Sequence, residues 1–116
     1  MAEAFLANVT ASQLRIMVTL SSKMGSIDDN TSGGSYLYRT SKTAANMAMK
    51  SLSIDLKSDG IACCVLHPGW VLTDMGGPNA LINTEQSVTG LRKVIADLNL
   101  NNAGRFIAYD GKVIPW

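Results

Sequence analysis

Ile61–Leu66 reads IACCVL, a run of six apolar residues with no polar position on either face of a strand. A strand that is covered on both faces carries such a continuous run, and parallel sheets are its usual setting. Shorter apolar runs lie on either side of it in the chain, at Arg15–Leu20 (RIMVTL) and Arg105–Tyr109 (RFIAY). Their β-branched and aromatic residues predict two further strands beside the central one.

Between these strands the apolar residues follow helical spacing. From about Tyr36 to Ser58 the pattern predicts one long helix, which Gly60 then stops. The broad apolar face of this helix consists of Ala44, Ala45, Ala48, Met49, Leu52 and Leu56. Asn83, with Gln86 three residues on, predicts the N-cap of a second helix. Its apolar stripe is Val88, Leu91, Ile95 and Leu98.

The order strand, helix, strand, helix, strand predicts an α/β fold with about three parallel strands and right-handed crossover helices. Polar or glycine-containing segments follow each strand: Ser21-Ser22, His67-Pro68-Gly69 and Asp110-Gly111. Binding sites of doubly wound sheets lie outside the carboxyl ends of the strands. We therefore expect the chemistry of this chain at that edge of the sheet.

Length and charge limit the classes of protein. A chain of 116 residues is one small domain or a piece of a larger one. Ten Lys and Arg against nine Asp and Glu give a net charge of +1, which argues against a nucleic-acid or anionic-membrane binder. No apolar run is long enough to cross a bilayer. The charged fraction, 16%, is below the usual value of about 25%, so we expect part of the surface to be covered by another surface.

The cysteines and the histidine predict neither a disulfide nor a metal site. Cys63 and Cys64 are adjacent, and neighbours on a strand point to opposite faces. We expect two buried free thiols, which suit a reducing, cytoplasmic environment. The chain has a single histidine, His67, and it is not at ligand spacing from either cysteine.

Tyr38 and Lys42 are the first candidates for chemistry. They are four residues apart near the start of the long helix, so they lie on one face. A nearby ammonium favours the phenolate, and such a pair can donate or accept a proton. Ser22, 16 positions before Tyr38, ends the preceding strand and could hydrogen-bond a substrate oxygen. The alternative is a packed tyrosine, a solvated lysine and a turn serine.

Three segments carry a family resemblance: VTLSSKMGS (18–26), GGSYLYRTSKTAANM (33–47) and LHPGWVLTDMGG (66–77). In this order, and on these elements, they resemble the short-chain dehydrogenase/reductase family. The YRTSK form with HPGWVLTDMGG is similar to the carbonyl reductase branch that includes sniffer and C-factor proteins. The resemblance covers nearly the whole chain, from about Leu14 to Trp116.

The resemblance assigns catalytic roles to three residues. It implies that Tyr38 is the general acid, that Lys42 tunes the tyrosine and holds the nicotinamide ribose, and that Ser22 orients the carbonyl oxygen. The gap from serine to tyrosine is longer than is common in the family, which leaves Ser21 as an alternative to Ser22. Arg39 stands where the family often has a small residue, and we interpret it as a feature of the branch.

The resemblance also implies a cofactor loop that begins after the central strand. Its members would be Pro68, Gly69, Val71 and Thr73, with the Val71 backbone and the Thr73 hydroxyl contacting the nicotinamide carboxamide. Tyr38 and Lys42 would share the cofactor contacts. The implied cofactor is NADP, with NAD as the alternative.

The family's glycine-rich turn, GxxxGxG, has no match among the ten glycines. We therefore expect residues 1–116 to be the C-terminal half of a Rossmann-like doubly wound sheet, a partial domain with little activity alone. The implied activity is reduction of a small-molecule carbonyl substrate by NAD(P)H. The alternative is a non-catalytic module that associates with a full-length reductase through the YxxxK helix, and the family implies a homo-oligomer.

Overall fold

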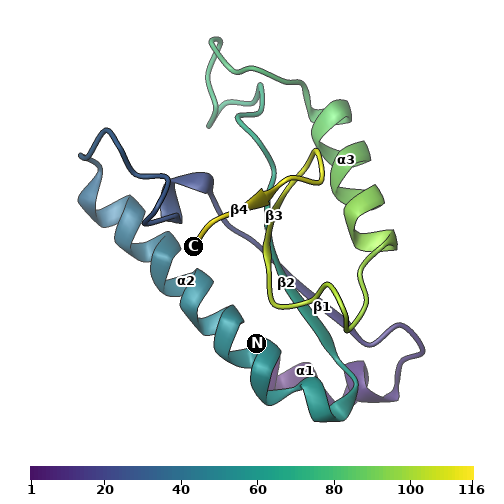
Figure 1. The fold of residues 1–116 in the computed structure, drawn as a ribbon. Helices are drawn as coiled ribbons and strands as arrows, with labels where there is room; N and C mark the ends of the chain where they lie inside the picture. Colours follow the sequence, from purple (N-terminus) through teal and green to yellow (C-terminus); the bar gives the residue numbers. More distant parts are fainter.

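The computed structural model describes residues 1–116 and contains one four-stranded sheet (Figure 1). The strands are β1 (Ile16–Leu20), β2 (Ala62–His67), β3 (Phe106–Ala108) and β4 (Val113–Ile114), in that spatial order. The first three are parallel, and β4 pairs with β3 in the antiparallel direction. Residues 62–66 of β2 are buried, as the continuous apolar run predicts.

Helices lie on both sides of the sheet (Figure 1). They are α1 (Ala2–Ala11), α2 (Tyr36–Asp55) and α3 (Thr84–Ala96), with two short 3₁₀ helices, η1 (Lys23–Gly25) and η2 (Lys57–Asp59). The α2 side packs Met49 and Leu56 against Cys63 and Val65. The other side packs Leu91, Ile95 and Leu98 against Cys64 and its neighbours on β2 and β3. Val88, predicted as part of the same stripe, is exposed instead. The result is the three-layer α/β arrangement that the sequence predicts.

Local signals explain where two of the helices begin and end. Asn83 and Gln86 form a complete capping box at the start of α3, because each side chain accepts a hydrogen bond from the other's backbone N–H. After α2 and η2, Gly60 takes a left-handed conformation with φ of 73°. A residue without a Cβ enters that region at no steric cost, so the chain can turn into β2 there.

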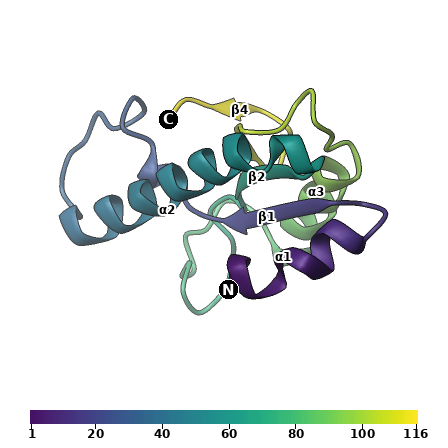
Figure 2. The same ribbon diagram turned by 90° about the horizontal axis from the view of Figure 1, so that it is seen from below.

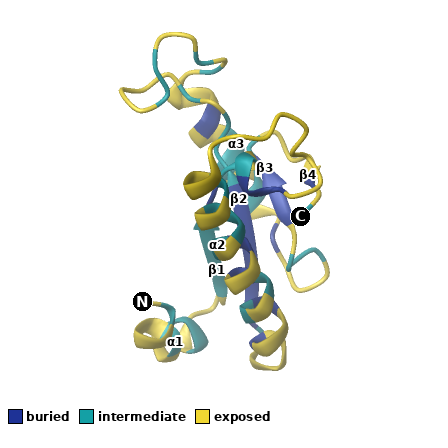
Figure 3. Ribbon diagram, turned by 90° about the vertical axis from the view of Figure 1, so that its left-hand side faces the viewer, coloured by how far each residue is buried: buried dark blue, intermediate teal, exposed yellow.

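The inner face of α2 differs from the prediction. Its buried residues are Asn46, Met49 and Ser53, whereas Ala44 and Ala48 are exposed. Figure 3 shows exposed segments along much of α2. The apolar face predicted from the sequence is therefore wrong at Ala44 and Ala48, because the buried face of α2 is centred on Asn46, Met49 and Ser53. Alanine carries little information about burial, and two polar residues, Asn46 and Ser53, occupy inner positions that hydropathy alone would assign to solvent.

The antiparallel strand β4 is also absent from the sequence prediction. The predicted turn at Asp110-Gly111 does form, with φ of 87° at Gly111, and it reverses the chain alongside β3. A strand of two residues has no measurable periodicity, so no pattern could identify it.

The opposite edge of the sheet is β1, which pairs with β2 alone. Helix α1 lies beside β1 (Figure 2), and its Leu6 and Val9 pack onto the α2-side cluster. No helix in the structure combines the length and hydropathy needed to cross a membrane.

Candidate functional site

The two serines at the end of β1 lie in different environments. Ser21 is buried, and its N–H donates to Leu66 O at 2.8 Å as the last rung of the ladder with β2. Ser22 is half-buried and is the N-cap of η1, where its Oγ accepts a hydrogen bond from Met24 N at 3.2 Å. Of the two hydroxyls, that of Ser22 is the more accessible at the carboxyl edge of the sheet.

Tyr38 and Lys42 lie together on α2, as their spacing predicts. The Lys42 ammonium nitrogen is 5.5 Å from the centroid of the Tyr38 ring, within cation–π range. Tyr38 is 37% exposed, and Lys42 is half-buried beside it. The pair thus presents a phenol and an ammonium to solvent at the first turns of one helix.

Contacts that the sequence did not reveal hold η1 against α2. Thr43 Oγ1 donates to Gly25 O at 2.8 Å, and Arg39 Nη1 donates to Met24 O at 3.3 Å. A Cβ on Gly25 would lie 2.8 Å from Lys42 Cβ, so glycine is what allows the two segments to approach this closely. These contacts fix the serine turn beside the helix that carries the tyrosine and lysine. From the sequence, we interpret Arg39 as a feature of the branch. In the structure its guanidinium links α2 to η1 through the hydrogen bond to Met24 O.

The Pro68-Gly69 turn is fastened to the α3 layer. Ser87 Oγ donates to Pro68 O at 2.6 Å, and Gly69 has a φ of 88°. A Cβ on Gly69 would lie 2.6 Å from Ile82 Cδ1 and 2.9 Å from the Tyr109 ring. Both the conformation and the space therefore require glycine, and the turn is rigidly placed at the end of β2.

Val71 and Thr73 lie in the loop that follows. Val71 forms an isolated bridge with Ile82, and its own N–H makes no hydrogen bond within the chain. Thr73 Oγ1 accepts from Gly76 N at 3.1 Å and donates weakly to Val71 O at 3.4 Å. The Val71 backbone donor is thus free, while the Thr73 hydroxyl is engaged inside the loop.

The charged and ionisable groups inside the fold are few. Burial raises the pKa of the Cys64 thiol to about 11 and raises that of Cys63 as well, and both cysteines are free. Burial lowers the pKa of His67, whose Nδ1 accepts a hydrogen bond from Lys23 N at 3.1 Å. No group of three His, Cys, Asp or Glu side chains is placed to hold a metal ion.

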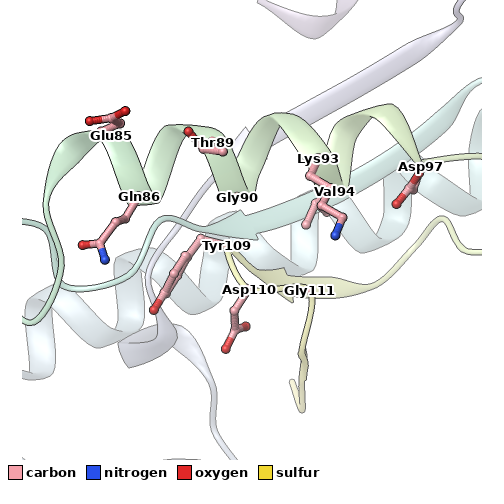
Figure 4. Close-up of a pocket in the computed structure, with 10 residues that line it drawn as sticks. All are labelled: Glu85, Gln86, Thr89, Gly90, Lys93, Val94, Asp97, Tyr109, Asp110 and Gly111. Carbon is pink, nitrogen blue, oxygen red and sulfur yellow. The ribbon is translucent and has the colours of Figure 1, made fainter.

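A hollow of the surface lies between α3 and the turn that joins β3 to β4 (Figure 4). It has a volume of about 700 Å³ and no contact with the tyrosine, lysine or serine described above. It is lined by Glu85, Gln86, Thr89, Gly90, Lys93, Val94, Asp97, Tyr109, Asp110 and Gly111. The lining thus combines three carboxylates, one lysine and the Tyr109 phenol, and none of the site residues predicted from the sequence belongs to it.

Comparison with known proteins identifies the family. The sequence model described as short chain dehydrogenase matches residues 1–83. The chain belongs to the short chain dehydrogenase family. Among curated relatives, C-signal of Myxococcus xanthus is 47% identical over 113 residues, covering 97% of this chain and 68% of C-signal.

Solved carbonyl reductases share the fold of the chain. Carbonyl reductase Sniffer of Drosophila melanogaster superposes with a TM-score of 0.93 at 40% identity, and the match covers 99% of this chain and 51% of Sniffer. The NADPH-bound carbonyl reductase from chicken fatty liver gives a TM-score of 0.90 at 34% identity, with coverage of 99% and 51%. The chain therefore spans about half the length of these carbonyl reductases, and its sheet corresponds to the C-terminal part of a Rossmann-like fold.

Proposed function

We propose that this chain provides the tyrosine, lysine and serine of an NAD(P)H-dependent carbonyl reductase. The observation that carries the proposal is the Lys42 ammonium 5.5 Å from the Tyr38 ring, on a helix to which the Ser22 turn is fastened. The fold agrees, because the chain superposes on carbonyl reductases of known structure. The substrate class is a small molecule with a ketone or aldehyde group.

Each of the three side chains has a distinct task in this proposal. The Ser22 hydroxyl donates a hydrogen bond that orients the carbonyl oxygen, and the Tyr38 hydroxyl gives that oxygen its proton. When bound, a reduced nicotinamide supplies the hydride that the carbonyl carbon accepts. Lys42 stabilises the phenolate that remains on Tyr38. Such acid catalysis by one positioned group contributes about 10²- to 10⁴-fold in rate.

The residues after β2 fit the nicotinamide end of a cofactor. The free N–H of Val71 can donate to a carboxamide oxygen, and the Pro68-Gly69 turn precedes it at the end of β2. Thr73 would join them once its hydroxyl leaves Gly76 N, and Lys42 would hold the ribose. NADP is the proposed cofactor, with NAD as the alternative.

The rest of the cofactor needs other residues. None of the ten glycines forms the GxxxGxG turn that holds a pyrophosphate, and binding energy from that remote group is what positions the reacting atoms. We propose that residues 1–116 are part of a Rossmann-like domain whose pyrophosphate site lies outside them, and that they are weakly active alone. Cytoplasmic location is part of the same proposal, since both thiols are free.

A second candidate function is a non-catalytic module that pairs with a second copy or with a full-length reductase. The outer face of α2 favours it, because Leu37, Met47 and Ile54 there are 88%, 66% and 65% exposed. Ala44 and Ala48 lie exposed on the same helix and would let a second helix approach closely. A helix face that carries large exposed apolar side chains is a candidate contact surface.

The test uses two assays, both monitored by NADPH fluorescence: cofactor titration and carbonyl-dependent oxidation of NADPH. Each assay compares the unchanged chain with Tyr38→Phe. Tyr36→Phe is the matched control, because Tyr36 is on the same helical turn and is 81% exposed. We expect slow turnover that Tyr38→Phe lowers by about a hundredfold or more and that the control retains. Equal turnover in both variants would refute the acid role. If neither the unchanged chain nor any variant binds cofactor, the non-catalytic module is the function that remains. Met47→Lys should then weaken self-association, as measured by light scattering.

A further inference from the structure

The hydrogen-bond ladder between β1 and β2 ends on a side chain. Ser21 N donates to Leu66 O at 2.8 Å, and two residues later Lys23 N donates to His67 Nδ1 at 3.1 Å. In a parallel ladder with Leu20 opposite Leu66, the next acceptor for Lys23 N would be the carbonyl of Pro68. An imidazole nitrogen occupies the place of that carbonyl.

The reason is the turn that begins at Pro68. Its carbonyl leaves the ladder and accepts from Ser87 Oγ at 2.6 Å, and proline has no N–H with which to continue the pairing. Without the imidazole, the backbone N–H that follows Ser22 would have no acceptor in the chain. The ring of His67 therefore closes the gap that the Pro68-Gly69 turn opens between the two strand ends.

We propose that His67 is a positioning residue, whose neutral imidazole accepts from Lys23 N and so holds the Ser22 turn in place beside the tyrosine helix. Lys23 follows Ser22 and is the first residue of η1. Ser22 caps that same short helix through Met24 N, so the direction of its hydroxyl depends on where η1 lies. The inference rests on the proposed function only for its effect on turnover; the hydrogen bond itself does not depend on it.

The surroundings of His67 keep the ring neutral. Burial lowers its pKa below the ordinary value of 6.5, and the Lys23 ammonium acts in the same direction. Asp110, in the turn after β3, and Asp29, in the loop after η1, oppose them. Asp29 also pairs with Lys23, at 3.5 Å, which weakens the effect of each on the ring. Since Nδ1 accepts a hydrogen bond, the proton of the neutral ring is on Nε2.

The pH dependence follows from the direction of the shift. The folded chain binds the proton less readily than the unfolded chain does, so the contribution of His67 to stability is complete above the unfolded pKa of about 6.5. It is lost as the pH falls through the lower folded pKa. Protonation places a hydrogen on Nδ1, opposite the Lys23 N–H, and the acceptor disappears. Acid should therefore release the Ser22 turn.

Nuclear magnetic resonance of the whole chain tests this, because His67 is the only histidine. We expect the neutral ring to carry its proton on Nε2, and the Lys23 amide shift to follow the titration of His67. Hydrogen exchange at Lys23 N should accelerate by about tenfold in His67→Ala, the equivalent of one hydrogen bond. His67→Asn offers a side-chain oxygen near the Nδ1 position, so it should restore the protection and remove its pH dependence.

Turnover separates the two proposals. If the chain is active, His67→Ala should lower kcat by about tenfold, leave the cofactor KM unchanged, and be rescued by His67→Asn. A proton on Nδ1 of the neutral ring, or a Lys23 amide insensitive both to pH and to His67→Ala, would overturn the positioning role whatever the activity. A chain that shows the expected spectra and exchange but no turnover in any variant would leave the role of His67 intact and refute the proposed weak activity of residues 1–116 alone.

Discussion

Gly25 is the point at which the serine-bearing turn lies closest to the tyrosine helix, and replacing it with alanine should separate them. An added Cβ would lie 2.8 Å from Lys42 Cβ, 2.9 Å from Lys42 C and 3.1 Å from Asn46 Nδ2. Ordinary contacts begin at 3.4 Å, and one of the clashing atoms is backbone, so rotation of a side chain cannot relieve the overlap. The whole of η1 must withdraw from α2.

Two terms set the size of the effect. Overpacking of this kind destabilises proteins by about 1–3 kcal/mol. The withdrawal also stretches the hydrogen bond from Thr43 Oγ1 to Gly25 O, now 2.8 Å, which contributes about 1 kcal/mol. We expect Gly25→Ala to lower the free energy of unfolding by about 2–3 kcal/mol. Circular dichroism in urea measures this loss. The unfolding midpoint of Gly25→Ala should be lower than that of the wild type by about 1 M or more.

The matched control is Ala48→Ser, which adds one heavy atom to the exposed face of the same helix. It should change the free energy of unfolding by no more than about 0.5 kcal/mol. Thr43→Val separates the two terms, because it removes the hydroxyl and keeps the shape. A Gly25→Ala variant as stable as the wild type, with hydrogen exchange in η1 unchanged, would show that the close approach of η1 and α2 is not required.

Two further expectations concern the interior and α3. Burial raises the pKa of the Cys64 thiol to about 11 and also raises the pKa of Cys63. Alkylation of the folded chain at neutral pH should therefore be at least about a hundredfold slower than alkylation in denaturant. Equal rates would contradict the burial of both thiols. Asn83→Ala removes the acceptor of Gln86 N, so the free energy of unfolding measured in urea should fall by about 1 kcal/mol. Asn83→Ser should recover most of that loss. An alanine variant as stable as the wild type would mean that the capping box does not stabilise α3.

The elements that the sequence predicted well are those with a local signal. IACCVL can be buried only if both of its faces are covered, and the structure places it in the middle of the sheet. Tyr38 and Lys42 meet because helical geometry brings residues four apart together. The capping box at Asn83 is likewise a contact between near neighbours. In each case the partners are close in the sequence, so spacing alone decides the outcome.

The elements that the sequence did not predict depend on distant partners. Ala44 and Ala48 carry no strong preference for burial, and only the packing of α2 on β2 shows that Asn46 and Ser53 face inward. Strand β4 forms because β3 offers it a free edge. The hydrogen bond from Lys23 N to His67 joins residues 44 positions apart, and no pattern in either segment announces it.

The sequence by itself determined the order of the elements, the parallel sheet, the family and the three side chains proposed to carry the chemistry. The order and the sheet follow from periodicity, whereas the family and the three side chains follow from short motifs that resemble those of the family. Both signals are properties of residues close together in the sequence. Only the tertiary structure decided how the serine turn is held: by Gly25 against α2, by Thr43 from that helix, and by His67 from the next strand. The physical reason is that a close approach and a hydrogen bond between strand ends exist only once the layers have packed.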